Sequence, residues 1–110
     1  MIVVTGCNSL AGKSLVRALL KEGKKVRGMD FWKTKSWPED IEFFETTVLD
    51  YEALLSACEG VEVVFHLMDV ENPIHDGRRY MKKVNIQGTQ NVLSAAAECG
   101  VKKVVRRSVW

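Results

Sequence analysis

Short apolar runs alternate along the chain with longer stretches in which apolar residues recur at helical spacing, and this alternation restricts the possible folds strongly. The expected strands cover residues 2–5, 25–30, 41–48, 61–67 and 103–108, and the expected helices cover residues 11–22, 51–58 and 78–99. Because parallel strands need helical crossovers, this order predicts an α/β fold with a doubly wound parallel sheet. We expect about five strands in the order 3-2-1-4-5, with a ligand crevice beside strands 1 and 4, where the order reverses.

The turn between the first expected strand and the first expected helix has the residue types of a phosphate-binding turn. Gly6 and Gly12 are the outer glycines of a G-x-x-G-x-x-G spacing, and Ser9 replaces the middle one. Asp30 ends the second expected strand, where a carboxylate can accept hydrogen bonds from an adenosine ribose. These residues predict a Rossmann-like domain in which the turn amides and the helix N-terminus face a pyrophosphate.

Three later segments resemble motifs of the extended short-chain dehydrogenase/reductase superfamily. Residues 60–67 read Gly-Val-Glu-Val-Val-Phe-His-Leu, similar to its G-V-D-x-V-F-H-L stretch. Residues 84–93 resemble its V-N-x-x-G-T-x-N-V-L helix motif, and residues 100–105 resemble its G-V-K-x-x-V entry to strand five. Together with the glycine turn, the resemblance covers essentially the whole chain. The Tyr80-x-x-x-Val84-Asn85 spacing is most similar to 3β-hydroxysteroid dehydrogenase/isomerase and its sterol-dehydrogenase and epimerase/dehydratase relatives.

The resemblance implies that the cofactor is NAD, with NADP less favoured because a 2′-phosphate would meet the Asp30 carboxylate. The cofactor-binding residues that it implies are Gly6, Ser9, Leu10, Gly12, Asp30, Val48, His66, Leu67 and Asn85. Gly6 and Gly12 would frame the pyrophosphate turn. At the position of Asn85 the family uses an asparagine to fix active-site backbone and water.

Some positions near the implied crevice depart from the family pattern. Thr47 stands where the family usually has the Asp of a G-D-x-x-D stretch near the adenine. Met68 and Asp69 replace the usual Ala-Ala after His-Leu, so a bulky side chain and a charge are expected to enter the crevice. Together with Ser9, these departures predict weak cofactor binding.

The catalytic residues of the family are missing from their expected places. The family reads V-Y-x-S-S at strand five, and this chain reads Val-Arg-Arg-Ser-Val over residues 105–109. The catalytic Ser/Thr therefore aligns with Val109, or with Ser108 after a slip of one position. The Tyr-x-x-x-Lys pair, which handles the alcohol proton, has no match, because neither Tyr51 nor Tyr80 has a lysine four residues later. We therefore assign no catalytic residue.

These features predict that residues 1–110 are the NAD(P)-binding Rossmann portion of a 3β-hydroxysteroid dehydrogenase/epimerase-like oxidoreductase, lacking the C-terminal catalytic and substrate part. By itself this portion is expected not to catalyse; the parent family's substrates would be steroids, flavonoids or nucleotide sugars. The alternative is a non-catalytic domain that senses a dinucleotide or binds a protein. A remote alternative, a P-loop nucleotide-binding protein, is suggested by Gly12-Lys13-Ser14, but Cys7 stands where the P-loop needs a glycine.

The composition indicates which binding partners and which cellular compartment to expect. A net charge of +2 with dispersed Lys and Arg gives no reason to expect nucleic acid. Cys7, Cys58 and Cys99 are far apart, which fits reduced thiols in the cytoplasm better than a disulfide framework or a metal site. A membrane anchor in a longer parent chain stays an open alternative. The fifth strand is expected to leave an exposed sheet edge through which chains could self-associate.

Overall fold

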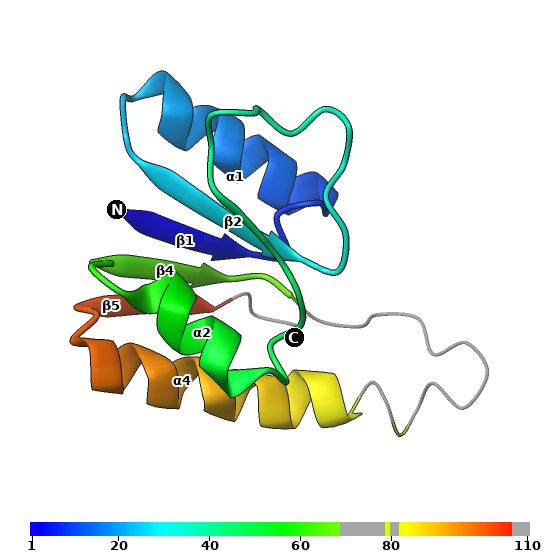
Figure 1. The fold of residues 1–110 in the computed structure, drawn as a ribbon, viewed down its shortest axis with the longest axis vertical. Coiled ribbons are helices and arrows are strands. Elements are labelled where there is room, and N and C mark those ends of the chain that lie inside the picture. The colour runs from blue at the N-terminus through cyan, green and yellow to red at the C-terminus, as the bar shows by residue number, and fades with distance from the viewer. Residues whose placement is uncertain (69–78, 80–81, 107–110) are drawn as a thin grey trace.

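The computed structural model describes residues 1–68, 79 and 82–106. Five parallel strands form one sheet in the order β3-β2-β1-β4-β5 (Figure 1). The strands are β1 (Ile2–Thr5), β2 (Val26–Asp30), β3 (Phe43–Glu45), β4 (Val63–His66) and β5 (Lys103–Arg106). The predicted fold class and strand order are confirmed. The expectation of a third strand over residues 41–48 was too long, because only Phe43–Glu45 follows the edge of β2 before the chain turns towards the next helix.

The helices cover both faces of this sheet. They are α1 (Leu10–Lys21), α2 (Tyr51–Cys58), the π-helix η1 (Lys83–Gln87) and α4 (Gly88–Cys99). Figure 1 shows α1 on one face and α2 beside α4 on the other. The structure corrects the expected uniform α-helix over residues 78–99, because its described part contains the wider π-helical turn of η1 before α4. Such turns are frequent at functional sites.

Consecutive residues of the central strand supply the two layers of the core. Val3 packs in the layer shared with α2 and α4, and Val4 packs in the layer shared with α1. Both valines are almost completely buried. Side chains alternate between the faces of a strand, so a strand covered on both faces needs an unbroken apolar run. This requirement explains the Ile-Val-Val sequence of β1.

Several residues that the sequence singled out lie outside the described residues, namely Asp69, Tyr80, Ser108 and Val109. Among the helices that the structure describes, none is long and apolar enough to cross a membrane.

Candidate functional site

The carboxyl ends of β1, β2 and β4 meet at one edge of the sheet, as parallel strands require, and the glycine turn crosses this edge. Gly6 has a φ of 73° and its N–H donates to the Met29 carbonyl at 2.8 Å. A Cβ on Gly6 would lie 2.6 Å from the Met68 nitrogen, so only glycine allows the turn to approach the end of β4. A Cβ on Gly12 would lie 2.3 Å from the Gly6 carbonyl oxygen. Gly6 is therefore required by its close approach to the end of β4, and Gly12 by close backbone packing within the turn.

Ser9 closes the turn from the inside. Its hydroxyl donates to the Gly6 carbonyl at 2.8 Å and accepts from the Gly12 N–H at 3.0 Å, which makes it the N-cap of α1. This cap explains why α1 begins at Leu10, one residue before the start expected from the sequence. At the position where the family motif has its middle glycine, the Ser9 side chain is therefore held by hydrogen bonds to the turn itself.

The first amides of α1 remain open on the outer side of this turn. Within the described part of the chain, the N–H groups of Leu10 and Ala11 donate no hydrogen bond. Leu10 is 86% exposed, so its side chain is not packed against the core over these amides. Unpaired amides at a helix N-terminus are donors for an anion such as a phosphate.

Asp30 ties the end of β2 to the glycine turn. Its carboxylate accepts from the Asn8 N–H at 2.9 Å and from the Phe31 N–H at 2.8 Å, one bond to each oxygen. The Asn8 side chain also donates to the Trp32 carbonyl at 2.6 Å. Each carboxylate oxygen accepts two hydrogen bonds, so Asp30 retains one acceptor position on each oxygen for a ligand. Asn8 is a positioning residue that the sequence reasoning missed.

His66 is buried at the end of β4 in a chain of hydrogen bonds between threonines. Its Nδ1 lies 2.8 Å from the Thr5 hydroxyl, and its Nε2 lies 3.2 Å from the Thr89 hydroxyl on α4. The Thr5 oxygen also accepts from the Leu67 and Met68 N–H groups, at 3.1 and 3.2 Å. Because its lone pairs are used, the Thr5 proton must point to Nδ1 of His66. His66 is therefore the Nε2–H tautomer and donates to Thr89.

His66 is neutral at physiological pH, and its hydrogen-bond network continues into η1. Burial, assisted by the charge of Arg106, lowers the pKa of His66 from 6.5 to about 4. Thr89 in turn donates to the Asn85 carbonyl at 2.7 Å. The imidazole is thus uncharged at neutral pH, and it joins Thr5 on β1 to Thr89 on α4. The sequence placed His66 and Asn85 at the site but did not reveal that Thr5 and Thr89 connect them.

Val48 contributes to this region through its backbone. Its side chain is completely buried, and a Cβ on Gly88 would lie 2.3 Å from the Val48 Cγ2 atom, so the valine fills the space left by that glycine. The Asn91 side chain donates to the Val48 carbonyl at 3.0 Å. The whole residue is buried in the core layer, so Val48 supports this region from within the core. Asn91 also escaped the sequence reasoning, although it lies in the matched V-N-x-x-G-T-x-N-V-L motif.

The expectation that Met68 enters the crevice was wrong. Its side chain is 2% exposed and belongs to the core layer that contains Val3 and Val84. The chain at Leu67 and Met68 is held by hydrogen bonds to Thr5, and this turns the methionine inwards. The bulk of Met68 is therefore no obstacle to a ligand at the strand ends.

Comparison with known proteins gives the family of the chain. The sequence model of the 3-beta hydroxysteroid dehydrogenase/isomerase family matches residues 3–110. An uncharacterized protein of Mycobacterium tuberculosis is 36% identical over 104 residues, which cover 94% of this chain and 11% of that protein. The sterol-4-alpha-carboxylate 3-dehydrogenase, decarboxylating, of Bos taurus is 31% identical over 106 residues, which cover 96% of this chain and 29% of that protein.

A solved structure agrees with this result. A short-chain dehydrogenase/reductase superfamily protein of Agrobacterium tumefaciens, crystallised with bound NAD, is 34% identical and superposes with a TM-score of 0.87. The match covers 96% of this chain and 31% of that one. The chain spans at most about a third of the length of the curated relatives that it matches.

Proposed function

The chain belongs to the 3-beta hydroxysteroid dehydrogenase/isomerase family, and we propose that it is the NAD-binding portion of an oxidoreductase. NAD supplies hydride transfer when it is bound. The residues of this chain would bind and orient it at the edge formed by the ends of β1, β2 and β4. We propose a substrate of the steroid, flavonoid or nucleotide-sugar class for the whole protein, consistent with the sterol dehydrogenase among its relatives.

The observation that carries the proposal is the connection between the glycine turn and Asp30. The turn presents the open amides of Leu10 and Ala11, and Asp30 holds the same turn through the Asn8 N–H at 2.9 Å. A diphosphate and an adenosine ribose are adjacent groups of one dinucleotide, so a single ligand would satisfy the donors and the acceptor together. Gly6 allows the required close backbone approach.

Asp30 would also select between the two nicotinamide cofactors. Its two open acceptor positions suit the two hydroxyls of the ribose, whereas a 2′-phosphate would place two negative charges in contact. We therefore propose NAD as the cofactor in preference to NADP.

The described residues offer no acid–base pair for the chemical step. His66 is neutral at physiological pH and both its ring nitrogens are hydrogen-bonded. Tyr51 is the first residue of α2, and its hydroxyl donates to Glu98 in the last turn of α4, at 3.0 Å. We propose that this portion binds and orients the cofactor and that it does not catalyse by itself.

Calorimetric titration of the native chain and of Asp30→Asn with NAD and NADP tests the proposal. The native chain is expected to prefer NAD. The substitution should reduce the NAD preference by about tenfold or more, since hydrogen bonds to a charged group contribute about 1.5–3 kcal/mol.

Asp40→Asn, in the exposed loop after β2, is the matched control for the loss of one negative charge. A disturbed turn would weaken the binding of NAD and of NADP to the same extent. The ratio of the two affinities is therefore the quantity that reports on ribose binding. An unchanged ratio in Asp30→Asn would contradict the assignment of Asp30 to the ribose.

A further inference from the structure

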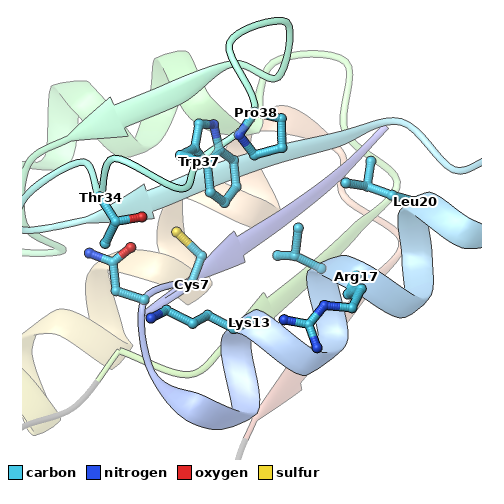
Figure 2. Close-up of a pocket in the computed structure, with 9 residues that line it drawn as sticks. Cys7, Lys13, Arg17, Leu20, Thr34, Trp37 and Pro38 are labelled. Atoms are coloured by element: carbon cyan, nitrogen blue, oxygen red, sulfur yellow. The ribbon is translucent and has the colours of Figure 1, made fainter.

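A hollow of about 150 Å³ lies between α1 and the loop that follows β2, on the sheet face away from α2 and α4 (Figure 2). Its apolar lining comes from Cys7, Val16, Leu20, Trp37 and Pro38. Cys7 and Val16 are almost completely buried, so the hollow has a closed apolar floor. Neither the fold nor the cofactor site described above uses this space.

The wall formed by Trp37 is held rigidly. Its indole N–H donates to the Ile41 carbonyl at 2.7 Å, and its ring packs edge-on against Phe43 with centroids 5.1 Å apart. A Cβ on Gly28 would lie 2.4 Å from the Trp37 ring, so the indole rests directly on the backbone of β2. The hollow therefore exists before any ligand arrives.

Cys7 behaves as part of this apolar wall. Burial, together with the charge of Asp30, raises the pKa of the Cys7 thiol to about 12. The thiol is protonated at physiological pH and is therefore no nucleophile. We consequently infer non-covalent binding at this position.

Two cations stand at the rim of the apolar space. Lys13 and Arg17 lie one turn apart on α1 and both line the hollow (Figure 2). Among the described residues neither forms an ion pair, and the lining contains no carboxylate. Thr34 adds a hydroxyl on the loop side. An apolar floor beneath uncompensated positive charge is complementary to an anion with an apolar body.

We propose that this hollow binds a small monoanion that carries one ring, of the aryl carboxylate class. A space of about 150 Å³ is large enough for one six-membered ring. The ring would lie against Trp37 and Val16, and the carboxylate would face Lys13 and Arg17. The hollow adjoins the cofactor turn through Cys7 and Asn8, and its other lining residues come from α1 and from the loop after β2.

Amide and indole chemical shifts of the ¹⁵N-labelled 110-residue chain, titrated with benzoate, test this proposal. Benzoate should shift the signals of Val16 and of the Trp37 indole N–H in a saturable way. Benzamide, which has the same shape and no charge, should bind about fivefold more weakly, as should benzoate to Lys13→Gln or Arg17→Gln. Lys21→Gln, on the same helix but outside the hollow, should bind benzoate like the native chain.

Several outcomes would overturn the proposal. Shifts spread over surface lysines without the Trp37 signal would mean non-specific anion binding. If benzamide bound as tightly as benzoate, Lys13 and Arg17 would have no role in recognising the carboxylate. The same would follow if Lys21→Gln weakened benzoate binding as much as Lys13→Gln or Arg17→Gln. Saturating NAD should leave the benzoate shifts at Val16 in place. Their loss would show that the hollow belongs to the dinucleotide site, including the region of a 2′-phosphate.

Discussion

Replacing His66 with Gln is predicted to remove a specific part of the pH dependence of folding stability. His66 is 5% exposed, and its pKa is lowered from 6.5 to about 4 by burial and by Arg106. Between these two values the unfolded chain binds a proton that the folded chain does not. The contribution of His66 to the free energy of unfolding is therefore fully present above pH 6.5 and is lost as the pH falls towards 4.

The difference between the two pKa values sets the size of the effect. At about 1.36 kcal/mol for each pKa unit, it corresponds to about 3 kcal/mol of unfolding free energy between neutral pH and pH 4. Glutamine is neutral throughout this range and reaches only one of the two threonine hydroxyls. It should cost about 1–2 kcal/mol at neutral pH. At pH 4 the variant should equal or exceed the native chain in stability.

Urea unfolding followed by circular dichroism, at several pH values from about 7.5 to about 4, measures this difference. Carboxylates titrate in the same range, so the native chain and the variant must be compared at each pH. Thr89→Val is the matched control, because it breaks a bond to His66 and leaves the imidazole in place. It should lower stability and retain the pH dependence.

The reasoning about His66 would be refuted by a difference between native chain and His66→Gln that does not change with pH. A second test is the imidazole ¹⁵N spectrum. It should show the Nε2–H tautomer and a pKa far below 6.5, and an Nδ1–H tautomer would contradict the proton direction deduced from Thr5.

Three further predictions concern the turn and the sheet edge. Gly12→Ala should destabilise the fold by about 1–3 kcal/mol in urea unfolding, because its Cβ would lie 2.3 Å from the Gly6 carbonyl oxygen. Ser14→Ala, exposed on the same helix, should change stability by less than about 0.5 kcal/mol; similar losses in both would contradict the packing argument. Ser9→Ala should cost about 1 kcal/mol, and Ser9→Gly only a few tenths. Ser9→Gly should also bind NAD more tightly by calorimetry, because it frees the Gly12 N–H; unchanged affinity would place the diphosphate elsewhere. Finally, β5 forms one edge of the described sheet, and we expect concentration-dependent association by light scattering, which a monomer at every concentration would exclude.

The agreement between predicted and observed fold depends on features that are local in the sequence. The apolar runs at residues 2–5 and 61–67 and the helical stretches between them leave few parallel topologies. Both ends of helices show such local chemistry, since Asp50 caps α2 through the Ala53 N–H and Gly100 ends α4 with a φ of 73°. Capping and turn chemistry involve neighbours along the chain, so they can be read without the tertiary structure.

The differences lie where a side chain meets a residue distant in the chain. Met68 was expected in the crevice and is in the core, because Thr5 holds the backbone that precedes it. The π-helical turn in η1 was not foreseen, since widening one turn changes the apolar periodicity by only a single residue. The short extent of β3 likewise depends on where its partner β2 ends.

The sequence by itself determined the parallel sheet, the glycine turn and an acid at the end of the second strand, because strand burial and turn conformation are imposed by local residue types. Only the tertiary structure decided that His66 bridges Thr5 and Thr89, partners that are 61 and 23 residues away, and that Trp37 closes a hollow beside Lys13 and Arg17. The physical reason is that hydrogen-bond direction, pKa and the shape of a cavity depend on which distant groups the folded chain brings within a few ångströms, and no local pattern encodes that proximity.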